Sequence, residues 1–124
     1  MTPRQVVETY WKIECTRDVD ATVQCYDPQA ELVVPGLGRL VGHEEIRRFY
    51  QASVERFPRL EVEIASALEV GDRGVFEWRS LFRDHAGVPY RSKGVNLIRV
   101  QGDRLAEVHV YYDPTDLEAP STEG

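Results

Sequence analysis

The sequence predicts an α+β domain in which a curved, cone-shaped antiparallel sheet wraps over three N-terminal helices and encloses a cavity. Apolar residues recur at helical spacing over residues 3–57, whereas they alternate with polar residues over 60–112. Tight turns at 71–74, 84–87 and 101–103 divide the second region into long strands, as in an antiparallel meander. A sheet bent over helices leaves a blind cavity, which is a natural site for a small molecule.

The N-terminal half predicts three helices. The first begins after Thr2, which can cap it and form a capping box, and is expected to run to about Arg17. A short second helix is expected over 18–26 and ends before Pro28, because proline disfavours helix in the residue before it. The third helix follows Gly42 and places apolar residues on one face as far as 57.

Five strands are expected from the remaining pattern. The first is short and is followed by a Pro-Gly loop over 35–38, whereas the last four are long and antiparallel. They are expected over 30–34, 60–70, 75–82, 91–100 and 105–112. The whole chain of 124 residues then forms one domain over 1–117, and the acidic tail over 118–124 is expected to fray.

Composition excludes several function classes. The net charge is −6 and no basic run is present, which argues against a nucleic-acid partner. No stretch reaches the roughly 18 apolar residues of a membrane span, and the N-terminus lacks a signal-peptide core, so a cytoplasmic location without a membrane partner is expected. Cys15 and Cys25 are expected as small buried side chains. His43, His85 and His109 are scattered, so no metal is expected. No phosphate loop or dinucleotide motif is present, so no cofactor is expected either.

Two strand positions carry polar groups that need an explanation. Asn96 shares a strand face with apolar residues, and a polar amide there needs a partner, either a ligand or another protein group. Glu77 and Arg79 share one face of their strand, whereas Trp78 lies on the opposite, apolar face. We expect Trp78 to face the cavity and keep Glu77 as an alternative base, because a slip of one residue would invert the strand.

The chain also resembles a known superfamily, the nuclear transport factor 2-like proteins, and in particular its ketosteroid isomerase and SnoaL-like polyketide cyclase branch. The resemblance covers residues from about 3 to 117. It rests on the element order and on five local patterns: Val7–Tyr10 (VETY), Tyr26–Ala30 (YDPQA), Gly42–Tyr50 (GHEEIRRFY), Gly102–Leu105 (GDRL) and Tyr111–Asp113 (YYD).

This resemblance implies a set of site residues. Tyr10 and Asn96 correspond to the two donors that hold an enolate oxygen in the isomerases, with Tyr26 and Tyr50 behind the first. Asp113 resembles the aspartate of the cyclases, and it shares with Glu77 the expected role of moving the proton. The side chains expected to bind the ligand are Tyr26, Val34, Tyr50, Trp78, Val108, Val110 and Tyr112.

The expected function is therefore a cofactor-free isomerase or cyclase that acts on a small apolar carbonyl compound, polyketide-like or steroid-like. Valine stands at the isomerase base position, Val34, which argues against steroid isomerisation by the usual route. The alternative is a non-catalytic ligand-binding or dimeric interaction domain of the same fold. An epoxide hydrolase is less favoured, because apolar residues occupy three of its expected polar positions. The resemblance also implies a homodimer through the outer sheet face.

Overall fold

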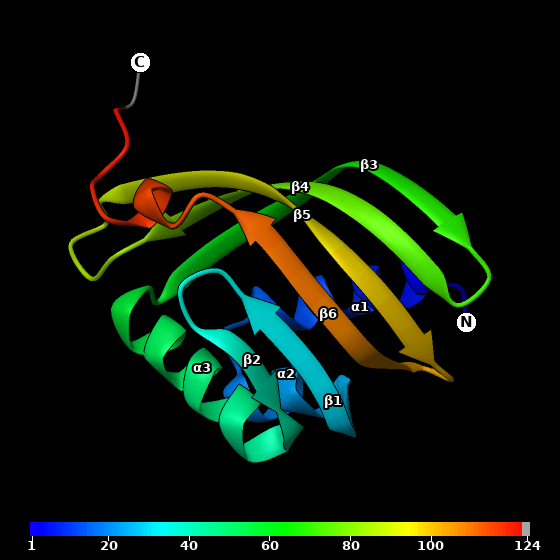
Figure 1. Cartoon of the computed structure of the whole chain (residues 1–124). Coiled ribbons are helices and arrows are strands. Elements are labelled where there is room, and N and C mark those ends of the chain that lie inside the picture. The colour runs from blue at the N-terminus through cyan, green and yellow to red at the C-terminus, as the bar shows by residue number, and fades with distance from the viewer. Residues whose placement is uncertain (123–124) are drawn as a thin grey trace.

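The computed structural model describes residues 1–122 as three α-helices, six strands and a short 3₁₀ helix (Figure 1). No helix in this part of the chain has the length and apolar character needed to cross a membrane. The elements follow in the order α1 (Pro3–Glu14), α2 (Val19–Gln24), β1 (Tyr26–Val34), β2 (Gly38–Val41), α3 (Gly42–Arg56), β3 (Arg59–Val70), β4 (Arg73–Arg83), β5 (Pro89–Gln101), β6 (Arg104–Tyr112) and η1 (Pro114–Leu117).

Helix α1 begins with the capping box that the sequence predicts. Thr2 Oγ1 accepts a hydrogen bond from the Gln5 backbone N–H at 3.2 Å, and Gln5 Oε1 accepts one from the Thr2 N–H at 2.9 Å. Two backbone donors that the first helical turn leaves free are thereby satisfied. The helix buries one face, made of Val6, Val7, Tyr10, Trp11 and Glu14, against the rest of the domain.

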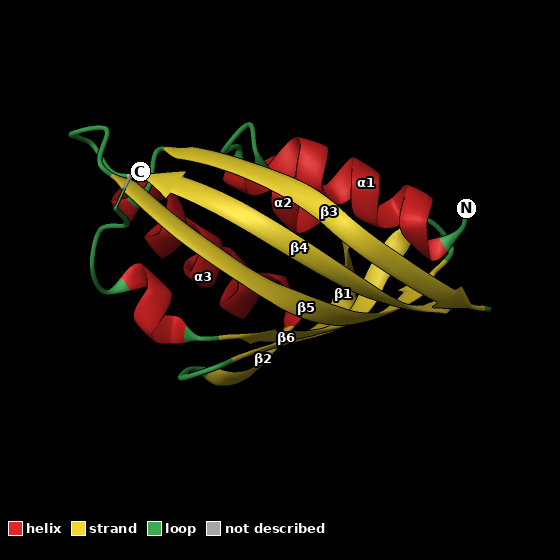
Figure 2. Ribbon diagram, turned by 90° about the horizontal axis from the view of Figure 1, so that it is seen from above, coloured by secondary structure: helices red, strands yellow, loops and turns green. Residues whose placement is uncertain are grey.

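The six strands form one curved sheet in the order β2-β1-β6-β5-β4-β3. The long strands arch over α1 and α3, which lie on the concave side (Figures 1 and 2). This confirms the predicted α+β class with a bent sheet over helices. The sheet is mixed rather than wholly antiparallel, because β1 and β6 pair in parallel.

The first strands differ most from the prediction. Strand β1 starts at Tyr26 and passes through Pro28, where the pairing with β6 shifts register between Tyr26 and Glu31. Such an irregularity accommodates a proline, which cannot donate to the ladder. Residues 38–41, expected partly as loop, form the edge strand β2, and Gly36 and Gly38 make the turn with φ values of 84° and 80°.

A bulge in β3 accounts for both the bend of the sheet and an error in the predicted strand face. Pairing with β4 shifts between Ile64 and Ser66, so one extra residue interrupts the alternation. The sequence pattern places Leu68 and Val70 on the same face as Ile64. Beyond the bulge they instead lie exposed, at 75% and 82% of their surfaces.

The C-terminal segment runs back beside the start of β5. After η1, the Ser121 N–H donates to the Pro89 carbonyl at 2.8 Å, and Ser121 Oγ accepts from the Arg91 N–H at 2.7 Å. The tail expected to fray over 118–124 is thus hydrogen-bonded to β5 at Ser121, and its last residues, 123–124, lie outside the described part of the chain.

Candidate functional site

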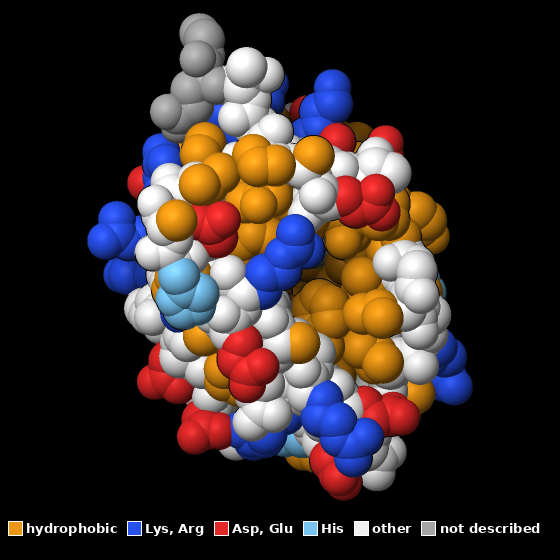
Figure 3. All heavy atoms as spheres, turned by 90° about the vertical axis from the view of Figure 1, so that its left-hand side faces the viewer, with side chains coloured by type: hydrophobic (Ala, Val, Ile, Leu, Met, Phe, Trp, Pro, Cys, Tyr) orange, Lys and Arg blue, Asp and Glu red, His pale blue; other side chains and the backbone are white. Residues whose placement is uncertain are grey.

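A cavity of about 300 Å³ lies between the concave sheet face, α1 and α3. Most of its wall is apolar, and its rim includes the exposed Leu37 together with Ala52 and Arg56. Figure 3 shows a face of the molecule on which hydrophobic side chains gather around a hollow. The polar or charged side chains of the wall are Tyr10, Glu14, Tyr26, Tyr50, Ser53, Arg56, Ser80, Ser92, Asn96 and Tyr112.

A chain of hydroxyl groups ends at a buried carboxyl. The Tyr10 hydroxyl donates to Glu14 Oε1 at 2.7 Å, and its oxygen lies 2.5 Å from the Tyr50 hydroxyl. The Tyr50 hydroxyl lies 2.6 Å from that of Tyr26. The three rings also pack edge-on or tilted, with centroids 5.8 to 6.4 Å apart. Burial raises the pKa of all three hydroxyls above the ordinary value, so they stay protonated.

Two opposing influences act on the Glu14 carboxyl. Burial raises its pKa above the ordinary value, whereas the hydrogen bond from Tyr10 and the charge of Arg17 lower it. Glu14 Oε2 lies 3.5 Å from Arg17 Nη1, and the two side chains are only 11% and 6% exposed. The net direction is upward, which brings the group closer to the neutral range where a carboxyl can both accept and release a proton.

Arg17 reaches Glu14 from an unusual backbone position. Its φ is 64°, a left-handed conformation that glycine usually supplies just after a helix and that costs another residue about 1–2 kcal/mol. The guanidinium is anchored by Nε to the Phe57 carbonyl at 3.1 Å and by Nη2 to Ser53 Oγ at 2.9 Å. Its Nη1 is buried and has no hydrogen-bond partner among residues 1–122.

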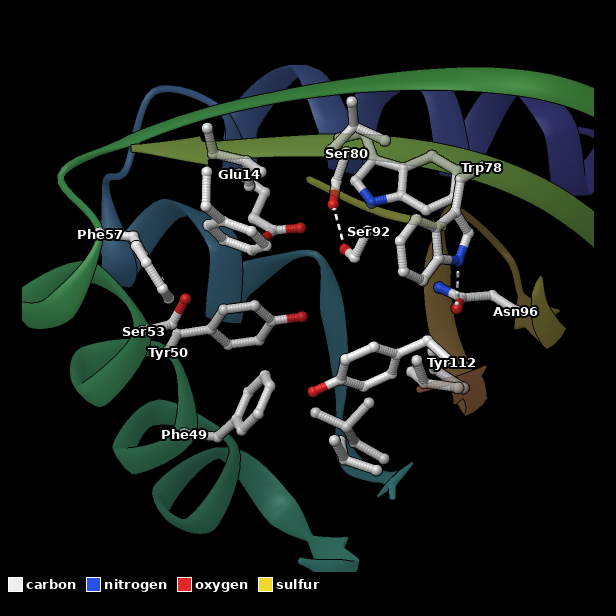
Figure 4. A pocket seen from close by; sticks show the side chains of 18 of the residues that line it. Glu14, Phe49, Tyr50, Ser53, Phe57, Trp78, Ser80, Ser92, Asn96 and Tyr112 are labelled. Carbon is white, nitrogen blue, oxygen red and sulfur yellow. Dashed lines mark hydrogen bonds between the residues drawn. The ribbon is translucent and has the colours of Figure 1, made fainter. Parts of the chain in front are cut away.

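The opposite wall presents donors to the cavity. The Trp78 Nε1–H donates to Asn96 Oδ1 at 2.9 Å. Because the indole N–H can only donate, this bond fixes which end of the Asn96 amide is oxygen and leaves the Nδ2 group on the cavity side (Figure 4). The Tyr112 hydroxyl points into the same space (Figure 4). Burial raises the pKa of Tyr112, so its hydroxyl is also a donor.

Gly94 allows this wall to form. It pairs with Trp78 on one side and with Tyr112 on the other, and the centroids of these two rings lie 6.1 Å apart. A Cβ at Gly94 would lie 2.4 Å from the Tyr111 carbonyl oxygen and 2.6 Å from Trp78 Cζ2, so any larger residue would push the rings apart.

One further polar pair lies in the wall. Ser80 Oγ and Ser92 Oγ are 2.5 Å apart on neighbouring strands and both are buried (Figure 4). One hydroxyl donates to the other, so one hydroxyl hydrogen of the pair remains available to a ligand.

The structure brings most of the residues predicted for the site together. Tyr10 and Asn96 lie in the wall, as do all seven side chains expected to bind a ligand: Tyr26, Val34, Tyr50, Trp78, Val108, Val110 and Tyr112. Trp78 faces the cavity and Glu77 faces away, so the strand register left open by the sequence is resolved.

The two carboxyls predicted as bases lie elsewhere. Glu77 is exposed on the outer sheet face and accepts a hydrogen bond from Ser66 Oγ. Asp113 is exposed and caps η1, where it accepts hydrogen bonds from the Thr115 hydroxyl and N–H that lower its pKa. Neither belongs to the cavity wall.

Sequence reasoning missed Glu14 as a site residue. Its signal was present, because Glu14 continues the buried stripe of α1 one turn after Tyr10, where an apolar residue would be expected. Among the lining residues of the described chain, Glu14 is the lone carboxyl.

His109 has acidic neighbours that the sequence did not indicate. Its Nε2 lies 2.8 Å from Glu31 Oε2, and Glu107 is close enough that the three groups can surround one ion. Both carboxylates already have cationic partners: Glu31 pairs with Arg39, and Glu107 pairs with Arg99. The hydrogen bond from His109, then that from Arg39, lowers the pKa of Glu31. We interpret the group as an ion-pair network between β1 and β6.

Comparisons with solved structures support the fold. A hypothetical protein from Catenulispora acidiphila with a ketosteroid isomerase-like fold, in complex with trimethylamine, matches at a TM-score of 0.81 and 18% identity, covering 94% of this chain and 91% of that one. TerC co-crystallised with polyporic acid matches at a TM-score of 0.79 and 17% identity, covering 94% of this chain and 95% of that one. A putative isomerase from Bacillus subtilis matches at a TM-score of 0.81 and 15% identity, covering 92% of this chain and 88% of that one.

A search of curated proteins finds no match to this sequence. A family model does match, over most of the chain: the SnoaL-like domain, aligned with residues 7–108. The aligned segment contains most of α1, all of α2 and α3, and nearly the whole sheet. It includes the wall residues discussed above except Val110 and Tyr112. The chain belongs to the SnoaL-like domain family.

Proposed function

We propose that this protein is a cofactor-free enzyme that removes and returns a proton beside the carbonyl of a small apolar compound, as an isomerase or a cyclase does. The observation that carries the proposal is the position of Glu14, the lone carboxyl of the described cavity wall, across the cavity from the Asn96 amide and the Tyr112 hydroxyl. A base on one side and donors on the other are the two parts that enolate chemistry needs.

Glu14 suits the role of base. Burial favours its neutral form and outweighs the Tyr10 hydroxyl and the Arg17 charge, so its pKa is raised and its carboxylate is a stronger base than an ordinary one. Proton transfer by a group placed in this way accelerates a reaction by about 10²–10⁴-fold.

The oxyanion would be held by the opposite wall. Tyr10 was expected to donate to the substrate, but its hydrogen is directed to Glu14 Oε1, so we assign it the positioning of the base. Asn96 Nδ2 keeps its hydrogens for a ligand, because its carbonyl end is bound by Trp78. One donor aimed at a developing oxyanion contributes about 2.7–4 kcal/mol.

The cavity suggests the kind of substrate. Its volume, about 300 Å³, is at the small end of ligand pockets, and its walls are mainly aromatic and aliphatic. A compact, flat, apolar carbonyl compound fits these features. We propose that the protein acts on such a molecule in the cytoplasm without a cofactor.

Deuterium exchange tests this proposal without knowledge of the natural substrate. β-Tetralone, an apolar ketone with exchangeable hydrogens, would be incubated with the protein in D₂O and followed by NMR. We expect exchange above the buffer rate, and a loss of about 10²–10⁴-fold in E14Q. The matched control is E8Q, the same change at an exposed position of α1. Equal exchange by E14Q and E8Q would exclude Glu14 as the base.

A non-catalytic ligand-binding domain is the second candidate. Val34 stands where the isomerases of this branch carry their base, and the tyrosine hydroxyls bond to one another rather than projecting singly. Tight binding of β-tetralone without any exchange would favour this second function.

We also propose a homodimer through the outer sheet face. Leu68, Val75 and Leu97 form an exposed apolar row across β3, β4 and β5, because each is paired with the next. Burial of this row would remove apolar surface from water. Analytical ultracentrifugation is expected to show a dimer for the wild type and a monomer for Leu97→Glu, whereas a monomeric wild type would contradict the proposal.

A further inference from the structure

The hydrogen atoms available to the tyrosine chain depend on the protonation of Glu14. Three hydrogen bonds link Glu14 to Tyr10, Tyr10 to Tyr50, and Tyr50 to Tyr26. When Glu14 is ionised, the three hydroxyls supply three hydrogens, and all are used within the chain. When Glu14 is protonated there are four hydrogens for the same three bonds, so one donor is released.

Tyr50 is the place where the released hydrogen can reach a ligand. It stands in the middle of the chain, so its oxygen can accept from both Tyr10 and Tyr26 while its own hydrogen turns to the cavity. Figure 4 shows the Tyr50 hydroxyl at the cavity side, facing the space that Tyr112 enters from the opposite wall.

We infer that Tyr50 donates to a ligand only while Glu14 is protonated, so that the site binds an anionic oxygen, an enolate or a phenolate, together with one proton. This inference rests on the proposed function, and it names the ligand class that the same site selects. In the reaction, Glu14 takes a proton from the substrate carbon. This proton reverses the direction of the hydrogen bonds from Glu14 through Tyr10 to Tyr50. The C–H bond breaks, the O–H bond of Glu14 forms, and the electron pair moves to the substrate oxygen.

Charge balance points the same way. Arg17 is always a cation and its side chain is 6% exposed, so its surroundings must hold about one negative charge. The ionised Glu14 supplies that charge in the empty site. An added oxyanion would bring a second negative charge into the same apolar space, unless Glu14 takes up a proton. Protonation of Glu14 therefore keeps the buried charge constant.

The other groups that face Glu14 lose their protons only at high pH. The groups that face it are the hydroxyls of Tyr10 on α1, Tyr50 on α3 and Tyr26 on β1, the Arg17 guanidinium, and the Cys15 and Cys25 thiols. Burial raises the pKa of Cys15 to about 11, and that of Cys25 and of the tyrosines above their ordinary values. A proton taken up below about pH 9 is therefore assigned to Glu14.

This arrangement would supply selective stabilisation of the enolate. While the keto substrate is bound, all the tyrosine hydroxyl hydrogens are used in bonds to one another and to Glu14. After proton transfer, the Tyr50 hydroxyl is free to donate to the enolate oxygen. An interaction that is present only after proton transfer lowers the barrier rather than merely tightening substrate binding.

Binding of dinitrophenolate tests the inference, because this probe stays ionised across the range of about pH 6 to pH 9. Calorimetry in buffers of different ionisation enthalpy measures the protons taken up. Above the Glu14 pKa, wild type and E8Q are expected to take up about one proton per phenolate, and the Kd should rise about tenfold per pH unit.

E14Q should behave differently. Arg17 Nη1 needs an acceptor, so the introduced amide turns its oxygen to Arg17 and its NH₂ to the Tyr10 oxygen. Tyr10 then donates to Tyr50, and the Tyr50 hydrogen stays available to a ligand, as it is when Glu14 is protonated. We expect phenolate binding without proton uptake and with a flat pH dependence. Y50F should bind the phenolate at least about tenfold more weakly than wild type at the acid end of the range.

Each outcome decides between the two proposals. Absence of proton uptake by wild type, absence of phenolate binding, or the same pH slope in E14Q overturns the inference, even if β-tetralone exchange depends on Glu14. Proton-linked phenolate binding without any β-tetralone exchange supports the inference and overturns the enzymatic function. The wild-type measurement needs no variant, so a failure of E14Q to fold leaves the test intact.

Discussion

Removal of the Tyr10 hydroxyl should destabilise the protein by an amount that depends on pH. In Tyr10→Phe, Glu14 Oε1 loses its 2.7 Å donor in a buried site. A hydrogen bond to a charged group contributes about 1.5–3 kcal/mol, and one between neutral groups about 0.5–1.5 kcal/mol. We expect a loss of about 2–3 kcal/mol in the free energy of unfolding above the Glu14 pKa, where the carboxyl is ionised, and of about 1 kcal/mol below it, where the carboxyl is neutral.

The sign follows from the direction of the pKa shift. Glu14 has a raised pKa in the folded state, so the native protein binds more protons than the unfolded chain, and stability falls as pH rises through the folded pKa. Tyr10→Phe removes a bond that lowers this pKa, so it should extend the fall to higher pH.

Urea denaturation followed by tryptophan fluorescence measures the effect, because Trp11 and Trp78 are both buried. The matched control is Tyr90→Phe, since Tyr90 makes its contacts with Phe57 and Arg56 through its ring. The control should change stability by less than about 0.5 kcal/mol. A Tyr10→Phe loss that is the same at the acid and alkaline ends of the titration would refute the assignment of an ionised Glu14 beneath Tyr10.

Three other substitutions test the remaining parts of the site. Gly94→Ala should destabilise the protein by about 1–3 kcal/mol through overpacking against Trp78, which a thermal melt would detect, and an unchanged melting temperature would contradict the close approach. Asn96→Ala should reduce β-tetralone exchange by about 10²–10³-fold with little change in KM, and a change confined to KM would argue against oxyanion stabilisation. Glu77→Gln and Asp113→Ala should leave exchange within about twofold of wild type, because both side chains lie outside the cavity, and a large loss in either would restore that residue as a candidate base.

The sequence predicted the helical and meander parts of the fold because their periods are regular. The capping box at Thr2 and the alternation through Phe76 and Trp78 depend only on residues close together in the sequence. Tertiary contacts therefore do not change them. The bulge near Ala65 is different, because an extra residue changes which face Leu68 occupies without altering the pattern of the letters. The parallel pairing of β1 with β6 also joins segments far apart in the chain, which periodicity does not reveal.

The cavity wall was more predictable than its chemistry. Aromatic and aliphatic positions such as Trp78 and Val108 follow from strand alternation, whereas the identity of the buried carboxyl depends on tertiary packing. The position of Glu14 in the buried stripe of α1 follows from the sequence, but its partners Tyr10 and Arg17 and its place in the cavity wall depend on the folded structure. Asp113 was a candidate base because it resembles the aspartate of the cyclases, whereas the structure shows it as the cap of η1.

The protonation of Glu14 can be measured directly by NMR titration of ¹³C-labelled glutamate carboxyls, with the resonance assigned by its absence in E14Q. Our account predicts a Glu14 pKa above the ordinary glutamate value and protonation of the group when dinitrophenolate binds. A Glu14 resonance that titrates at or below the ordinary value, and that is unaffected by the phenolate, would contradict the account.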